Sequence, residues 1–471
     1  MNKSQLDKND GLAAIFRHNV RLDKIVYVPI DQIKGYSRDL RRRSDAGRVA
    51  LKNSVSCFGI VAPILIDQHD VIIAGAGIVE AARAVGYTEV PTVRIDHLGA
   101  GEVRLLRIAL NKLSEFSTWD NPELAVELVE LLSLDLTLDY EVTGFNTIEI
   151  DNLIHAPATR DVDDPDDEQI PIGDLGSEVT RLGDLWDLGD HQALCGSSLD
   201  QANLTLLMAG DSARMVLVDQ PYNVPISGHV SGLGKHQHRE FAQASGEMSE
   251  EEFTAFLTQS IKVLAACCHD GSLVYLYMDW RHQWEMLTAL RAAGLTMLNL
   301  AVWVKRSGSM GAFYRSQHEL CFIAKKGAAP HRNNVQLGRY GRNRTNCWFY
   351  PGVNTFSAER DELLAMHPTC KNVSMLSDAI RDATHRGEIV LDGFLGSGST
   401  LIAAERTARR CYGVELDPRY VDTIVQRWEK ATGKVATLRD TGETFAETAA
   451  RRAAEVARPE IVIQPRKRVT A

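Results

Sequence analysis

The chain of 471 residues lacks several features that would place it in a special class of protein. No apolar run is long enough for a transmembrane helix, which needs about 20 residues. The opening stretch, MNKSQLDKNDGLAAIF, lacks the charged-then-apolar pattern of a signal peptide. We therefore expect a cytoplasmic protein with no membrane partner. The length exceeds what one hydrophobic core organises, so we expect about two to four domains.

Paired metal-binding cysteines are also lacking. The eight cysteines include no CxxC pair and no spacing with flanking histidines, so a structural zinc site is not expected. Free thiols in a reducing compartment are the default. A glycine-rich loop holds His229, His236 and His238, but no Cys or carboxylate spacing accompanies them. We expect this loop to face solvent, and we expect no metal cofactor.

The chain has no excess of positive charge, since its net charge is −10. That total argues against a nucleic-acid partner, but the charges are unevenly distributed. Residues 157–178 combine an acidic cluster with prolines and are expected to form a solvated linker. Residues 325–346 hold no acidic residue, and their basic residues alternate with Asn, Gln and Tyr. Such a segment can neutralise phosphates and contact base edges. Its candidate DNA-binding residues are Lys325, Lys326, Arg332, Arg339, Arg342 and Arg344.

Residues 20–100 alternate between strand and helix patterns, which predicts a small α/β unit. A glycine turn at 75–77 precedes a predicted helix at 78–85, and the turn itself carries no side chain able to bind a phosphate. Residues 101–156 have apolar positions at helical spacing. We expect them to form a helical extension that packs on the α/β unit.

The stretch Val216-Leu217-Val218-Asp219 reads as a buried strand that ends in a carboxylate. In open α/β sheets, ligands bind beyond the carboxyl ends of the strands. The tetrad that starts at this carboxylate offers an acceptor side chain, backbone carbonyls and a flat ring, a set that suits an exocyclic amine. A strand followed by an ordinary proline turn is the alternative. The candidate catalytic residues are Asp219, Gln220, Pro221 and Tyr222.

A second strand pattern, at 389–392, leads into the glycine turn of LDGFLGSGST and then into a helix. A further strand ends at Glu415, about twenty residues beyond the glycines, the distance at which an acidic side chain reads the hydroxyls of an adenosine ribose. No Walker lysine follows the glycines. These features together predict a cofactor that contains adenosine.

With these motifs in this order, residues 180–433 resemble the β-class amino-methyltransferases of DNA. VDQPYN resembles the catalytic motif of that family, LDGFLGSGST its cofactor motif, YGVELDPRYV its acidic motif, and HPTCK the segment before the cofactor motif. FGIVAPILID and IIAGAGIVEAARAVGYTEVPTV resemble the ParB-like nuclease domain found fused to such enzymes in phages and mobile elements. The resemblance implies an α/β chain. A small ParB-like domain would precede a doubly wound, Rossmann-like methyltransferase domain at 179–435.

The resemblance also implies roles for the site residues. The Asp219 side chain and the Gln220 carbonyl would hold the N6 hydrogens of adenine, and Tyr222 would stack on a base flipped out of double-stranded DNA. Residues 325–365 would recognise the target sequence. Apart from the resemblance, the basic composition of residues 436–471 predicts a disordered tail. The cofactor would be S-adenosyl-L-methionine, bound by Asp392, Phe394, Gly396, Gly398 and Glu415, with Thr369 and Lys371 near its methionine carboxylate.

Four positions depart from the usual family pattern: Gln220, Gly393 and Asn372 stand where proline is usual, and Ser399 stands for threonine. Gln220 matters most, because a proline there stiffens the backbone that aims the carbonyl. Aspartate at 219 favours adenine over cytosine. Cytosine-N4 methylation and a DNA-binding, partition-like protein with weakened catalysis remain the alternatives. The sequence leaves open the recognition site, whether the protein is a homodimer, and whether a restriction nuclease accompanies it.

Overall fold

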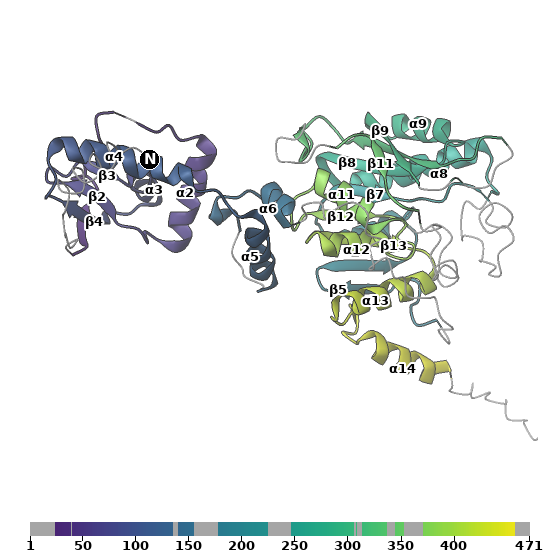
Figure 1. The fold of residues 1–471 in the computed structure, drawn as a ribbon. Helices are drawn as coiled ribbons and strands as arrows, with labels where there is room; N and C mark the ends of the chain where they lie inside the picture. The colour runs from purple at the N-terminus through teal and green to yellow at the C-terminus, as the bar shows by residue number, and fades with distance from the viewer. Residues whose placement is uncertain are drawn as a thin grey trace, which may run out of the picture. The chain divides into compact units, whose positions relative to one another are not determined.

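The computed structural model describes residues 24–38, 40–134, 140–154, 178–224, 246–305, 308, 313–336, 344–352 and 371–456. The chain forms two compact units, Met1–Ala156 and Pro157–Ala471 (Figure 1). Within the described ranges, no helix is both long enough and apolar enough to cross a bilayer.

The first unit is built around a four-stranded sheet of order β1-β4-β2-β3. Two helices accompany the sheet, and Ile64 and Ile66 are fully buried in the core that it forms with α3. The predicted alternation of strands and helices is confirmed. The elements are β1 (Val26–Pro29), α2 (Asp45–Phe58), β2 (Ile64–Asp67), β3 (Ile72–Ala74), α3 (Ala76–Val85) and β4 (Glu89–Ile95).

The turn before α3 requires glycine, because Gly75 has a φ of 97° and a Cβ there would lie 2.8 Å from Ile64 Cδ1. A Cβ on Gly77 would lie only 2.6 Å from Nε of Arg43. The guanidinium of Arg43 therefore lies against the start of α3. The turn has no cationic side chain of its own, but the basic run at 38–43 supplies one.

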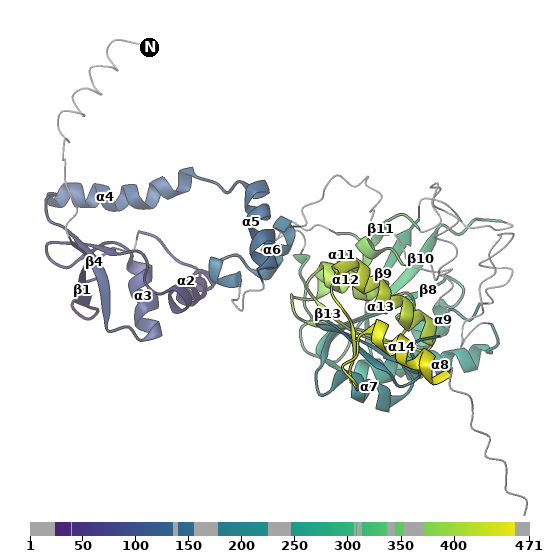
Figure 2. The ribbon, with the colours of Figure 1, turned by 90° about the horizontal axis from the view of Figure 1, so that it is seen from below.

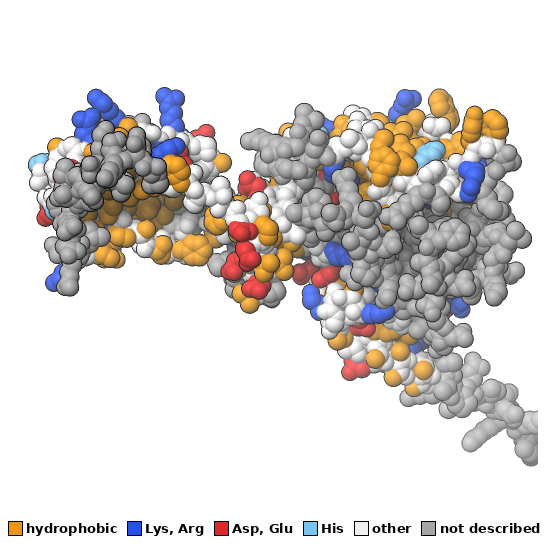
Figure 3. Space-filling model, in the orientation of Figure 1, with side chains coloured by type: hydrophobic (Ala, Val, Ile, Leu, Met, Phe, Trp, Pro, Cys, Tyr) orange, Lys and Arg blue, Asp and Glu red, His pale blue; other side chains and the backbone are white. Residues whose placement is uncertain are grey.

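Helices follow this sheet: α4 (Ala100–Leu113), α5 (Asn121–Ser133) and α6 (Thr147–Ile154), with short 3₁₀ turns after α4 and before α6. Arg107 fixes α4 to the sheet, since its guanidinium donates to the Ile72 carbonyl at 3.1 Å and covers the Tyr36 ring at 3.7 Å. Acidic and apolar side chains gather on α5 (Figure 3). Its exposed acidic residues are Glu123, Glu127 and Glu130.

The second unit is organised by a sheet whose described strands have the order β11-β9-β10-β8-β7-β12-β13-β6-β5-β14. Its central strands, from β8 to β6, are all parallel. The strands are β5 (Leu185–Leu188), β6 (His191–Cys195), β7 (Ala213–Val218), β8 (Cys268–Met278), β9 (Thr296–Val304), β10 (His318–Lys325), β11 (Cys347–Phe349), β12 (Ile389–Asp392), β13 (Arg410–Glu415) and β14 (Thr437–Leu438).

Helices cover both faces of this sheet, which makes it doubly wound, as predicted. Strand β7 shows the two layers: Met215 and Leu217 belong to one core, whereas Val216 and Val218 belong to the other. The first core includes α11 (Val373–Ala383), α12 (Ser399–Arg406) and α13 (Pro418–Thr432), which lie together in Figure 2. The second includes α7 (Gln201–Met208), α8 (Glu250–Ala266) and α9 (Gln283–Ala292).

The order of the parallel strands reverses between β7 and β12. Strand β7 pairs with β8, the next strand along the chain, on one side. On its other side it pairs with β12, which in turn pairs with β13. The carboxyl ends at such a reversal diverge and leave a crevice for a ligand. The two predicted motifs, after β7 and after β12, therefore meet at this crevice.

The expectation of a disordered tail from residue 436 is wrong for its first part. Residues 437–456 include β14 and the helix α14 (Phe445–Val456). The Phe445 ring lies 5.5 Å from that of Trp186, and Arg452 is ion-paired with Asp184 in a largely buried contact. Composition alone suggested solvated arginines, whereas this arginine faces inward. Residues 457–471 lie outside the described part of the chain.

Candidate active site

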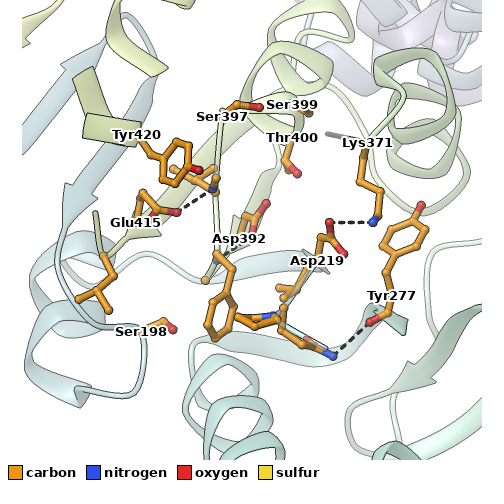
Figure 4. Close-up of a pocket in the computed structure, with 18 of the residues that line it drawn as sticks. Ser198, Asp219, Tyr277, Lys371, Asp392, Ser397, Ser399, Thr400, Glu415 and Tyr420 are labelled. Carbon is orange, nitrogen blue, oxygen red and sulfur yellow. Dashed lines mark hydrogen bonds and ion pairs between the residues drawn. The ribbon is translucent and has the colours of Figure 1, made fainter. Parts of the chain in front are cut away.

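A pocket opens at the reversal between β7 and β12 and is lined by the residues that follow both strands (Figure 4). The end of β6 and the end of β13 complete the wall. The pocket brings together nine of the residues predicted from sequence: Asp219, Gln220, Pro221, Tyr222, Lys371, Asp392, Phe394, Gly396 and Glu415. Gly398 lies at the same turn as the N-cap of α12. Thr369 falls outside the described residues.

Asp219 and Tyr222 contact each other inside this pocket. The Tyr222 hydroxyl lies 2.8 Å from Asp219 Oδ1 and 3.2 Å from Glu319 Oε2, and it donates to these carboxylates. Burial and the two negative charges raise the pKa of Tyr222, so the phenol keeps its proton. The Tyr222 hydroxyl is thus a direct hydrogen-bond partner of the Asp219 carboxylate.

Gln220 is held in place by its own side chain. The residue is buried, and its Nε2 donates to the backbone carbonyl of Tyr277 on β8 at 3.3 Å. In Figure 4 this bond is the dashed line that ends at Tyr277. The hydrogen bond restrains the residue that stands where the family usually has proline.

Asn223, which the sequence analysis did not single out, fixes the end of the tetrad. It has a φ of 54°, a left-handed conformation that asparagine tolerates better than most residues. Its Oδ1 accepts from the amides of Gly246 and Met248, and its Nδ2 donates to the Met248 carbonyl at 2.8 Å. The chain before and after residues 225–245 is thereby joined. The three loop histidines considered as metal ligands lie within 225–245, outside the described residues.

Lys371 contacts the carboxylate of Asp219. Its Nζ is 2.7 Å from Asp219 Oδ2 and 2.9 Å from Glu319 Oε2, and the side chain is buried. Lys305 is ion-paired with the other oxygen of Glu319. The sequence resemblance had assigned Lys371 to the cofactor carboxylate; here it pairs with Asp219 (Figure 4).

The ionisation of these groups follows from their burial and mutual contacts. Burial opposes the charge of Lys371, but the carboxylates of Asp219 and Glu319 outweigh it and raise its pKa. Burial likewise opposes the charge of Glu319, but Lys371 and Lys305 lower its pKa to about 2. Burial raises the pKa of Asp219, and Lys371 counteracts that rise.

The other half of the pocket is a glycine turn with two carboxyl groups. Glu415, at the end of β13, accepts from the Gly396 amide at 2.8 Å and from the Asp417 amide at 2.9 Å. Asp392, at the end of β12, accepts from the Phe394 amide at 2.9 Å. Burial raises the pKa of both Asp392 and Glu415 to about 7.

The remaining departures from the family pattern also have structural contacts. Asn372 is the N-cap of α11, and its side chain accepts from the Met375 amide at 2.9 Å. A Cβ on Gly393 would lie 3.0 Å from a Leu264 methyl and 3.2 Å from Ser198 Cβ, so the space is tight there. Ser399 keeps a hydroxyl, which lies 3.3 Å from the guanidinium of Arg427.

The predicted DNA-binding residues that the structure describes, Lys325, Lys326, Arg332 and Arg344, are not among the residues that line this pocket. Lys325 and Lys326 donate to the carbonyls of Ala329 and Cys268 at 3.1 and 2.7 Å, and Arg332 pairs with Glu388 at 3.1 Å. Arg344 lies between Asp378 and Asp382, 2.7 Å from each, and its side chain is only 15% exposed. Burial opposes its charge, but the two aspartates raise its pKa. This placement gives Arg344 a structural role. Arg339 and Arg342 lie outside the described residues.

The described residues contain no cluster of three His, Cys, Asp or Glu side chains with the arrangement of a metal site. The cysteines in the described ranges are all free thiols.

Comparison with known proteins gives two matches to protein families. Residues 213–426 match a DNA methylase family, the N6/N4 methyltransferases, and residues 122–182 match the ParB-methyltransferase HTH domain. The second match covers α5 and α6 and runs across the acidic segment. The sequence analysis had treated those regions as a helical extension and a linker and did not identify a helix-turn-helix domain.

Several individual proteins are also similar to this chain. The Escherichia coli (strain K12) protein YubD, named as a methylase, is 29% identical over 215 residues, which are 45% of this chain and 79% of that protein. The Type II methyltransferase M2.DpnII of Streptococcus pneumoniae is 23% identical over 230 residues, covering 47% and 84%. Among solved structures, the cytosine-N4-specific PvuII DNA methyltransferase has 16% identity and a TM-score of 0.39, covering 52% of this chain and 90% of that one.

Proposed function

We propose that this protein methylates N6 of adenine in double-stranded DNA. The proposal is supported by the matches of the chain to a DNA methylase domain of the N6/N4 family and to a ParB-methyltransferase HTH domain. The methyl donor is S-adenosyl-L-methionine. One observation carries the proposal: Asp219 and the glycine turn at Gly396 lie in one pocket at the reversal of the sheet. An amine acceptor and a nucleoside site there lie within reach of each other.

The residues of the pocket fit this cofactor. Asp392 and Glu415 offer carboxylates to ribose hydroxyls and to positive charge, and the rings of Phe394 and Tyr420 line the same wall. The one cationic side chain among the described lining residues, Lys371, is occupied by Asp219 and Glu319. The glycine half is therefore acidic, as a ligand with a sulfonium and an ammonium group requires. The cofactor supplies an electrophilic methyl group on sulfur.

The chemistry needs the amine to become a better nucleophile, because its lone pair is delocalised into the adenine ring. Asp219 and the Gln220 carbonyl accept hydrogen bonds from the two N–H groups and favour a tetrahedral nitrogen. When bound, the cofactor would supply the methyl group and keep the electron pair of the broken S–C bond as a neutral thioether. The Asp219 carboxylate, which accepts a hydrogen bond from the amine, would take the proton that the methylated nitrogen loses and pass it to solvent. Positioning and fixed charges supply the rate enhancement.

Access to the amine requires that the base leave the duplex, because N6 is paired in the helix. Tyr222 would release Asp219 and stack on the flipped base. We assign target recognition to residues 325–365 and general DNA contact to the ParB-like and helix-turn-helix regions. The exposed acidic residues of α5 indicate that its outward face is not the one that meets phosphate.

Cytosine N4 is the second candidate, because the matching family includes both activities and both use the same acceptor geometry. The aspartate at 219 favours adenine. One experiment separates the two. Genomic DNA from a host that lacks DNA methylases is incubated with the protein and the cofactor, and modified bases are mapped at single-base resolution. Adenine-N6 signal at a defined sequence is expected, and Asp219→Ala removes it while cofactor binding persists. Signal at cytosine N4 would favour the second candidate, and no modification by the wild type would contradict both.

A further inference from the structure

We propose that Lys371 is a positioning residue that occupies one oxygen of Asp219 and so reserves the other oxygen for the target amine. The inference rests on the proposed function, because it concerns the group that receives the amine. It assigns to this lysine a role at the reacting nitrogen.

The contacts on Asp219 divide between its two oxygens. Lys371 Nζ lies 2.7 Å from Oδ2, whereas the Tyr222 hydroxyl lies 2.8 Å from Oδ1. The Lys371 ammonium is buried and paired with two carboxylates, whereas the Tyr222 ring would have to leave Oδ1 for a base to stack on it. Oδ1 is therefore the oxygen that an incoming N–H would meet, and the Tyr222 hydroxyl marks its position.

Lys371 is also held in place by contacts with residues other than Asp219. Its ammonium is 2.9 Å from Glu319 Oε2 and 3.2 Å from the Tyr222 hydroxyl, and it lies over the Tyr277 ring at 5.2 Å. Lys305 holds the second oxygen of Glu319. The result is an alternating row of charges, Lys305, Glu319, Lys371 and Asp219, that runs from the end of β9 and the start of β10 to the end of β7.

This row sets the sign of two effects on Asp219. The positive charge of Lys371 favours the ionised carboxylate that accepts hydrogen bonds, whereas the negative charge of Glu319 disfavours it. Removal of the Lys371 charge is therefore expected to make Asp219 harder to ionise. Removal of the Glu319 charge is expected to make Asp219 easier to ionise. The groups that act on or beside Asp219 are Lys371, Glu319, Tyr222, Lys305, Tyr277, Cys321 and Asp392.

The test uses the full chain, with turnover measured from pH 5.5 to 9 at saturating cofactor and DNA, so that cofactor affinity does not contribute. Lys371→Met is expected to reduce turnover at least tenfold at pH 7, to move the acidic limb of the profile to higher pH, and to recover in part at pH 9. Lys371→Arg keeps the positive charge, so the acidic limb of its pH profile is expected to stay at the wild-type pH. Glu319→Gln is expected to move the limb to lower pH.

Lys262→Met, an exposed lysine on α8, is the matched control and should leave the profile unchanged. Cofactor affinity, measured by calorimetry, is expected to change less than twofold in every variant. A limb that does not move in Lys371→Met, or an equal loss of affinity and turnover, overturns the inference. If Lys371→Met does not fold, an unmoved limb in Glu319→Gln has the same meaning.

A second readout does not depend on turnover. Carboxyl ¹³C NMR of the wild type, with Asp219→Asn used to assign the signal, follows the ionisation of Asp219 directly. The expected order of its midpoint is Glu319→Gln lowest, then wild type, then Lys371→Met. A wild type that transfers no methyl group but shows this order would contradict the proposed function alone. Methyl transfer without this order would contradict the inference alone.

Discussion

The side-chain amide of Gln220 donates to the backbone carbonyl of Tyr277 at 3.3 Å and ties the catalytic turn to the neighbouring strand. The bond joins residues 57 positions apart. It provides, through a cross-strand contact, the restraint that a proline ring provides locally in related enzymes. The departure at this position is thus compatible with an active site that holds its carbonyl in place.

We predict that Gln220→Ala lowers turnover about fivefold, because a buried hydrogen bond contributes about 1 kcal/mol and each 1.4 kcal/mol corresponds to a factor of ten. Cofactor affinity should stay the same, since the change lies on the base side. Gln201→Ala, an exposed glutamine on α7, is the control. Gln220→Pro is expected to retain more turnover than Gln220→Ala. Equal turnover in Gln220→Ala and wild type would show that the bond restrains nothing relevant to catalysis.

Binding of the cofactor should strengthen as the pH rises from 6 to 8. Burial raises the pKa of Asp392 and Glu415 to about 7, so each is mostly protonated at pH 6 and mostly ionised at pH 8. The ionised forms accept from hydroxyls and attract positive charge. If binding requires the ionised form of one particular carboxyl of this pair, the affinity for the cofactor rises about tenfold between pH 6 and pH 8. Calorimetry in buffers of different ionisation enthalpy also reports proton release on binding.

The variants Asp392→Asn and Glu415→Gln identify the titrating group. Each is expected to weaken binding at pH 8, and the variant at the responsible residue should flatten the pH dependence. An affinity that falls with rising pH would contradict the assigned role of both carboxyls.

The helix α14 should contribute to the stability of the methylase unit. Arg452 donates to the Val179 carbonyl at 2.5 Å and to Asp184 Oδ1 at 2.9 Å, and both side chains are largely buried. Arg452→Ala leaves Asp184 buried without its partner, which typically costs about 3–5 kcal/mol. Chemical denaturation of the second unit measures the loss.

The adjacent residue offers a matched control. Arg451 makes exposed ion pairs with Glu443 and Glu455, and Arg451→Ala should change stability little. Similar stabilities of the Arg451→Ala and Arg452→Ala variants would show that α14 does not pack on the unit in solution.

Two arginines of the basic segment should behave differently on substitution. Arg344 is enclosed by Asp378 and Asp382, so Arg344→Ala should destabilise the fold by about 3–5 kcal/mol. Arg332 is 42% exposed, and Arg332→Ala should leave the fold intact. If Arg332 contacts phosphate, its loss also reduces the slope of log affinity against log salt by about one. Thermal unfolding and DNA binding at several salt concentrations distinguish the two effects. A stable Arg344→Ala variant with weakened DNA binding would reverse the assignment.

Much of the fold could be predicted because buried parallel strands appear as continuous apolar runs. Residues 216–218 and 389–391 are such runs, and each is followed by residues with side-chain or backbone chemistry. Their meeting in one pocket follows from the rule that parallel strands end at the same edge. Pattern and motif were therefore sufficient for the central parallel strands of the second unit and for the meeting of the residues that follow β7 and β12.

Contacts between distant segments could not be predicted in the same way. Lys371 was assigned to the cofactor by its motif, but its position depends on where β10 places Glu319. Arg344 was counted among the DNA-binding residues because its own segment of the sequence contains no acidic residue. The two aspartates of α11 that pair with it become its neighbours only when the chain folds. The same holds for Arg452: the many basic residues around it in the sequence suggested a solvated tail, whereas in the folded chain it pairs with Asp184. Charged residues need their partners in space before a role can be assigned.

The register of β7 against β12 has a consequence for how such a protein changes over generations. Met215 pairs with Val390 and Val216 with Leu391, so the two halves of the pocket are joined by backbone hydrogen bonds although they lie far apart in the chain. The connection between β10 and β11 falls outside this pairing. An exchange of that connection would leave the pairing of β7 with β12 in place, provided that the contacts of Arg344 with Asp378 and Asp382 are kept. On the proposed function, DNA specificity would then change through this connection while the paired strands that hold both halves of the pocket stay the same.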